Sequence, residues 1–284
     1  MGFHQKPNLY IRDVSINVMN LKVSLAFYRD FLGFKVLEEG ERYAALTADG
    51  KTALIKLYQP EGVTPKEARK TGLYHFAILL PSRAELGKIL IHLVKNNYRL
   101  GASNHLVSEA LYLNDPDGNG IEIYRDREDT EWKWDNRNQV EMTSDPIDGE
   151  GVIAAAQGEE WEGMPSETIM GHIHLHVSNL QEAGTFYREI LGYDLVCEYG
   201  GQALFLSTGK YHHHIGMNTW NGAGAPAPSE NSVGLREYSI SIPTEEYKQN
   251  IIRSLEQSGL TYVEENGVLY MKDPSQNSIV LYVE

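Results

Sequence analysis

Histidine is suited both to metal ligation and to proton transfer near neutral pH, because its ring titrates close to that pH. The chain contains ten histidines, and six of them lie within residues 172–214. They form an alternating run, His172-Ile-His174-Leu-His176, and a consecutive run at 212–214. An affinity tag would lie at a terminus, whereas this cluster is internal. The cluster therefore predicts a metal site or acid–base chemistry.

The alternating run has the period of a β-strand, which places its histidines on one face and the aliphatic residues between them on the other. A helix packed on this sheet must cover the aliphatic face, so we expect the histidines on the opposite face. The same alternation, applied to residues 211–218, places His212 and His214 on the face away from the helix. It turns His213 toward the aliphatic face.

A matching pair of residues lies in the first half of the chain. His75 begins an apolar strand at a position that corresponds to His172, and Glu122 lies in mid-strand between two isoleucines. Both side chains should face away from the helix. Two imidazoles and a carboxylate that leave coordination positions open are the ligand set typical of non-haem Fe(II) oxygenases. The alternative is that the three are separate polar groups on half-exposed sheets.

These strands belong to a unit that the chain repeats. Shifting the sequence by 159 positions aligns residues 13–51 with 172–210 without a gap, and 12 of the 39 positions agree. Residues 113–124 and 271–282 share an Asp-Pro turn followed by an apolar strand. Each unit predicts one strand, one helix and three further strands. The four units span residues 9–58, 72–125, 168–220 and 235–284.

Local signals mark the ends of the predicted helices. Asn20 and Asn179 precede helical spacing, as N-caps do, and Gly33 and Gly192 follow it, as C-terminal stops do. Residues 126–167 break the repeat and are predicted to form a long connection. The expected organisation is a first module pair at 1–125, the connection at 126–167 and a second module pair at 168–284.

The fourfold pattern resembles the vicinal-oxygen-chelate superfamily of glyoxalase I, bleomycin-resistance proteins and dioxygenases, and in detail it is similar to the extradiol catechol 2,3-dioxygenases. In that family a Gly-His supplies the first metal ligand, as in Gly171-His172. A strand-opening His supplies the second, as in Tyr74-His75-Phe-Ala-Ile. The Glu of an Ile-Glu-Ile-Tyr strand supplies the third, as does Glu122.

The resemblance implies an α+β fold, in which four βαβββ modules form two glyoxalase-like domains with curved mixed sheets and helices on the convex face. It also implies residues that act on the substrate. Tyr112 matches the tyrosine ten residues before the ligand Glu, and His105 matches a nearby His-x-Val-Ser motif. The family's acid–base histidine falls within the 212–214 run, where face and register favour His214, with His212 in reserve.

The sequence departs from the family in one respect. The outer modules lack the ligands, since Glu237 and Val280 replace them in the fourth unit and Asp13 and Ile55 in the first. The ligands therefore come from the two middle modules. We expect module two to pair with module three and module one with module four, within one chain or across two.

The resemblance implies that the protein opens a catechol or substituted catechol beside the diol, using O2 and Fe(II). The product would be of the 2-hydroxymuconic-semialdehyde type, and Mn(II) suits the same ligands. Two alternatives remain, a glyoxalase-type metal-dependent isomerase or lyase and a metal-free small-molecule binding protein. The expected assembly is a homo-oligomer, a dimer or larger.

Composition excludes other classes of protein. The formal charge of −14 opposes binding to nucleic acid, and the apolar runs are too short to cross a membrane. A single cysteine cannot form an internal disulfide, and the first residues lack the apolar core of a secretion signal. These features predict a cytoplasmic protein.

Overall fold

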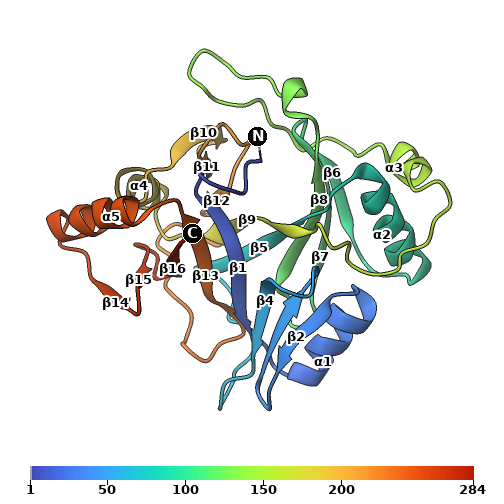
Figure 1. The fold of residues 1–284 in the computed structure, drawn as a ribbon, viewed down its shortest axis with the longest axis horizontal. Coiled ribbons are helices and arrows are strands. Elements are labelled where there is room, and N and C mark those ends of the chain that lie inside the picture. The colour runs from blue at the N-terminus through green and yellow to red at the C-terminus, as the bar shows by residue number, and fades with distance from the viewer. Residues whose placement is uncertain (1) are drawn as a thin grey trace.

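The computed structural model describes residues 2–284, which fold into four βαβββ modules joined by a long connection (Figure 1). Module 1 comprises β1 (Tyr10–Asn17), α1 (Leu21–Leu25), the π-helical turn η1 (Ala26–Phe31), β2 (Lys35–Glu39), β3 (Tyr43–Thr47) and β4 (Ala53–Tyr58). Module 2 comprises β5 (Gly72–Leu79), α2 (Arg83–Lys95), β6 (Gly101–Asn104), β7 (Ser108–Asn114) and β8 (Gly120–Asp126). The connection contains η2 (Asp129–Glu131) and α3 (Gly149–Ala155).

The second half of the chain repeats this order. Module 3 comprises β9 (Ile169–His176), α4 (Leu180–Thr185), the π-helical turn η3 (Phe186–Ile190), β10 (Asp194–Tyr199), β11 (Ala203–Ser207) and β12 (Ile215–Asn218). Module 4 comprises β13 (Gly234–Ile242), α5 (Glu245–Gln257), β14 (Tyr262–Glu265), β15 (Val268–Lys272) and β16 (Ser278–Val283).

The predicted helix signals act as expected. The Asn20 side chain accepts hydrogen bonds from the first turn of α1, and Asn179 does the same for α4. Gly33 and Gly192 follow the π-helical turns with φ of +87° and +85°, a conformation that glycine adopts without steric cost. Each helix then turns back into the outer strands of its module.

Two eight-stranded mixed sheets form the body of the protein. Their strand orders are β14-β15-β16-β13-β1-β4-β3-β2 and β10-β11-β12-β9-β5-β8-β7-β6. Module 1 thus joins module 4 through the antiparallel pair β1–β13, and module 2 joins module 3 through β5–β9. This confirms the expected pairing of modules, and the pairing occurs within one chain. It also confirms the predicted α+β fold of two glyoxalase-like domains.

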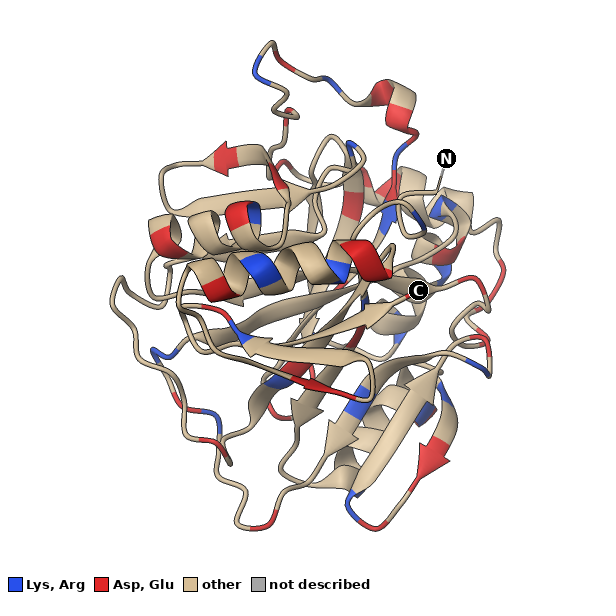
Figure 2. Cartoon of the chain, turned by 60° about the vertical axis from the view of Figure 1, so that its left-hand side comes forward, with Lys and Arg blue, Asp and Glu red and all other residues tan. Residues whose placement is uncertain are grey.

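The helices lie on the outside of the sheets (Figure 1). Ile173 and Leu175 of β9 are fully buried in the main hydrophobic core together with Tyr187 from η3, so the aliphatic face of this strand packs as its alternation predicts. Charged residues lie mainly on helices and loops, while most strand residues are uncharged (Figure 2). Within residues 2–284, no helix is both long and apolar enough to cross a bilayer.

Candidate metal centre

Three neighbouring strands bring His75, Glu122 and His172 to one point. β5 lies between β8 and β9, and its Ala77 is in register with Glu122 on one side and His172 on the other. One ligand atom from each of the three residues lies within 4.8 Å of the others. Glu122 Oε2 is 3.0 Å from His75 Nε2 and 3.1 Å from His172 Nε2. The three predicted ligands therefore form one buried cluster.

The cluster is incomplete without a further group. Both imidazole Nε2 atoms lie close to the same carboxylate oxygen, which accepts a hydrogen bond from His172. His75 Nε2 is buried and makes no hydrogen bond within residues 2–284, because its approach to Glu122 has the distance but not the direction of one. A buried ring nitrogen normally has a partner. A cation at this point would give His75 Nε2 the partner that it lacks, and would replace the hydrogen bond between His172 and Glu122.

The protonation states of Glu122 and His172 suit metal binding. Burial raises the pKa of Glu122, but the adjacent rings of His172 and His75 outweigh it, so the net pKa lies well below its ordinary value. Burial lowers the pKa of His172 to about 4, against the opposing effect of Glu122. Near neutral pH the cluster therefore offers a carboxylate and a neutral imidazole, the forms in which these side chains bind metals.

A cavity of about 210 Å³ opens onto the cluster, with His75 and Glu122 in its wall. Ligand sites for drug-sized molecules are about 300–1,000 Å³, so this cavity suits a smaller ligand. Its wall is mainly aromatic and apolar. The other lining residues are Tyr74, Ser103, His105, Tyr112, Met142, Thr143, Ser144, His174, Tyr199, Phe205, His213 and Trp220.

His105 and Tyr112 lie in this wall and bond to one another, which places both predicted residues together. His105 Nδ1 is 2.5 Å from the Thr143 carbonyl, and its Nε2 is 2.6 Å from the Tyr112 hydroxyl. Since the carbonyl can only accept, His105 donates from Nδ1, and its Nε2 accepts from Tyr112. Burial and the nearby Glu122 raise the pKa of Tyr112 well above its ordinary value, so its hydroxyl stays protonated.

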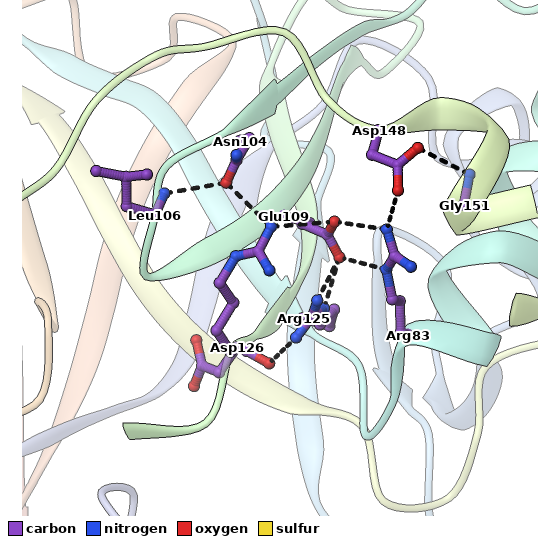
Figure 3. A network of polar contacts seen from close by, with 9 residues as sticks. Arg83, Asn104, Leu106, Glu109, Arg125, Asp126, Asp148 and Gly151 are labelled. Carbon is purple, nitrogen blue, oxygen red and sulfur yellow. Dashed lines mark hydrogen bonds and ion pairs between the residues drawn. The ribbon is translucent and has the colours of Figure 1, made fainter. Parts of the chain in front are cut away.

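The segment that carries Thr143 is held by a charge network (Figure 3). Glu109 on β7 is fully buried and forms ion pairs with Arg83, Arg125 and Arg127. Arg83 also pairs with Asp148 at 3.0 Å, and Asp148 caps α3 through Gly151. The network ties the middle of the connection, at Asp148, to module 2. It thereby supports the cavity wall formed by residues 142–144.

The histidine run at 212–214 differs from its predicted arrangement. His213 lines the cavity, and its ring centroid is 4.1 Å from that of His172. His214 is not among the lining residues, and its Nε2 donates to the Phe3 carbonyl at 3.2 Å. His212 also lies outside the cavity wall and bonds to Asp126. The prediction that His212 and His214 share the catalytic face is therefore wrong.

The physical reason is local backbone geometry. Strand alternation applies only where the chain is extended, and β12 begins at Ile215, after the run has ended. Gly209 and Lys210 both have positive φ, 64° and 62°, and turn the chain just before the run. Gly209 was the feature of the sequence that could have indicated this turn. The places of Tyr74 and Met142 in the cavity wall could not be predicted from the sequence, because no pattern assigned either side chain a role there.

At the corresponding position in the other sheet, a lysine side chain supplies the positive charge. Asp13 occupies the place of His172, and the Lys56 ammonium lies 2.9 Å from its carboxylate. Ser239 donates a second hydrogen bond to the same carboxylate oxygen. A lysine thus neutralises Asp13, and only the inner modules assemble a set of metal ligands within the described residues.

Comparisons with known proteins agree with this geometry. The sequence profile of the Glyoxalase/Bleomycin resistance protein/Dioxygenase superfamily matches residues 10–123. A catechol-2,3-dioxygenase of Bacillus subtilis (strain 168) is 43% identical over 276 residues, which cover 96% of this chain and 97% of the relative.

Solved structures show the same fold at low sequence identity. A protein from Bacillus subtilis that is assigned as a dioxygenase superimposes with a TM-score of 0.67 at 14% identity, over 98% of this chain and 86% of the other. Glyoxalase I from Zea mays gives a TM-score of 0.59 at 16% identity, over 96% and 92% of the two chains. By its near full-length similarity to the catechol-2,3-dioxygenase, the chain belongs to the glyoxalase/bleomycin resistance protein/dioxygenase superfamily.

Proposed function

We propose that the protein is an extradiol dioxygenase that opens catechol, or a substituted catechol, beside the diol with O2. The observation that carries the proposal is the cluster of His75, Glu122 and His172 beside a small aromatic cavity. His75 and Glu122 line this cavity together with a hydrogen-bonded His105–Tyr112 pair. A B. subtilis relative at 43% identity bears the name of this activity, which supports the same assignment.

The residues fit Fe(II), which His75, Glu122 and His172 would hold while leaving coordination positions open. When bound at these residues, iron would supply the electron transfer that lets O2 react with the ring. Mn(II) suits the same ligands, and the proposal favours iron because the two-histidine, one-carboxylate set is typical of iron oxygenases.

The protein residues have separate roles in this proposal. Tyr74 and Trp220 pack edge to face at 5.1 Å and form an apolar wall for the aromatic ring. The Tyr112 hydroxyl, held in place by its hydrogen bond to His105, is positioned to hydrogen-bond to a diol oxygen. His213 takes the role expected for His214, because it is the member of the run that reaches the cavity. Burial lowers the pKa of His213 well below its ordinary value, so it starts as a neutral base.

The experiment is anaerobic loading with Fe(II), followed by addition of catechol in air. We expect O2 uptake and a yellow semialdehyde product in equal amounts. A protein with bound iron but no O2 uptake would refute the proposal, and conversion without O2 would favour a glyoxalase-type reaction. His75→Ala should lose both iron and activity. The matched control is His92→Gln, since His92 lies on α2 and contacts the Phe31 carbonyl instead of the cavity.

A further inference from the structure

An unbroken chain of hydrogen bonds leads from a second surface hollow to the cavity. Asp126, at the end of β8, lines this hollow together with Phe3 and Trp132. Its Oδ1 lies 2.7 Å from His212 Nε2. His212 Nδ1 lies 2.8 Å from His213 Nδ1, and the ring of His213 lines the cavity beside the metal cluster. His212 is fully buried and reaches neither surface.

The direction of each bond follows from the first acceptor. A carboxylate has no proton to donate, so His212 donates from Nε2 to Asp126. A neutral His212 then has an unprotonated Nδ1. The two facing Nδ1 atoms must share one proton, which His213 therefore supplies. In a neutral His213 the remaining nitrogen, Nε2, is left without a proton, and no hydrogen bond within residues 2–284 engages it.

Two tyrosines strengthen the carboxylate end of the chain. The Tyr211 hydroxyl donates to Asp126 Oδ1 at 3.2 Å. It accepts in turn from the Tyr124 hydroxyl, 2.7 Å away. Both tyrosines are fully buried. These bonds hold Asp126 as an acceptor and so keep the direction of the histidine chain fixed.

We propose that Asp126 and His212 are positioning residues that fix the tautomer of His213 and present its unprotonated Nε2 to the substrate. This inference rests on the proposed function. In the reaction, a catechol O–H bond would break and an N–H bond would form at His213 Nε2, while the electron pair stays on the oxygen. His212 and Asp126 would stabilise the resulting imidazolium through its Nδ1–H, as the buried aspartate of a Ser-His-Asp triad does for its histidine.

The test compares Asp126→Asn with Asp129→Asn. Asp129 lines the same surface hollow but is exposed and makes no contact with the histidine chain. The amide that replaces the Asp126 carboxylate can donate to His212 and so reverse the chain. We expect kcat to fall by about 100-fold or more, as a wrong histidine tautomer does in a catalytic triad. KM for catechol and iron content should stay within about threefold, and Asp129→Asn should behave as the wild type.

Histidine tautomers provide a readout that does not depend on activity. In the zinc-loaded, 15N-histidine-labelled protein, which is diamagnetic, we expect His213 to carry its proton on Nδ1 and His212 on Nε2. Asp126→Asn should move the His213 proton to Nε2, and Asp126→Glu should retain the wild-type tautomers. A wild-type His213 protonated on Nε2 would overturn the inference, and so would a fall in kcat with unchanged tautomers.

The inference and the proposed function fail in different ways. If iron-loaded wild type consumes O2 with catechol and Asp126→Asn keeps the full kcat, the inference is wrong and the dioxygenase assignment stands. If the wild type is inactive while the tautomers are as expected and reverse in Asp126→Asn, the assignment is wrong and the positioning role stands.

Discussion

Gly171 immediately precedes the proposed ligand His172, and the structure leaves no room for a side chain there. A Cβ at this position would overlap the Tyr124 hydroxyl and lie 2.6 Å from Cζ and 2.7 Å from Cε1 of the same ring. Ordinary carbon contacts are about 3.5 Å, so the ring or the strand must move by roughly 1 Å. Tyr124 is fully buried and bonded to Tyr211, which leaves it no direction in which to move freely.

We therefore expect Gly171→Ala to destabilise the protein substantially. Overpacking of a buried site costs about 1–3 kcal/mol, and loss of the Tyr124–Tyr211 hydrogen bond adds about 1 kcal/mol. The unfolding free energy should fall by about 2–4 kcal/mol, which lowers Tm by about 3–7 °C for a chain of this length. Urea and thermal unfolding of the metal-free protein measure this change. Iron affinity should fall as well, because any shift of β9 displaces His172.

Two variants separate crowding at Tyr124 from a general effect of alanine. Gly149→Ala is the matched control, since no atom lies within 4 Å of its added Cβ, and its stability should change by less than about 0.5 kcal/mol. Adding Tyr124→Phe to Gly171→Ala removes the most crowded atom, so the double variant should be more stable than Gly171→Ala alone. A Gly171→Ala protein as stable as the wild type would refute the reasoning.

Replacing Glu109 by Gln leaves its arginine partners facing a buried amide and should lower the unfolding free energy by about 2–4 kcal/mol in urea titrations. Burial raises the pKa of Glu109, but the arginines outweigh the effect of burial and hold this pKa below its ordinary 4.5. The loss of unfolding free energy in Glu109→Gln should therefore be complete above about pH 5 and shrink as the pH falls below 4.5. Tyr112→Phe removes the donor to His105 and should lower kcat about 100-fold with iron content unchanged; an unchanged kcat in O2-uptake assays would contradict its role. Trp220→Ala opens the apolar wall and should raise KM for catechol about tenfold, since losing this contact costs about 1–2 kcal/mol; steady-state kinetics with no change in KM would argue against ring packing there.

Sequence patterns identified the parts of the protein that follow regular periods. The alternation of 172–177 placed the proposed ligand His172 opposite the aliphatic face because these residues do form an extended strand, β9. The absence of ligands at Asp13 and Val280 indicated which modules pair, since only the inner modules carry a full set. Pairing of β5 with β9 follows from that inference and appears in the structure.

The remaining features depend on tertiary contacts that no period records. His213 reaches the cavity through a turn at residues 209–210, so its direction cannot be read from strand alternation. Residues 142–144 line the cavity although the connection has no repeat of its own, because the Glu109 network and the His105–Thr143 bond bring them there. Asp126 lies four residues beyond Glu122 and meets His212 only in the folded chain.

The nested pairing of modules has a consequence for the order in which the protein can be completed. During synthesis, the strands that carry His75 and Glu122 emerge first, but β5 keeps an open edge until β9 has been made and has paired with it. The edge of β1 that pairs with β13 stays open longer still, because β13 lies near the end of the chain. A nascent chain therefore carries both open strand edges while the residues between β5 and β9 are made, and the metal can be captured only after the inner sheet has closed.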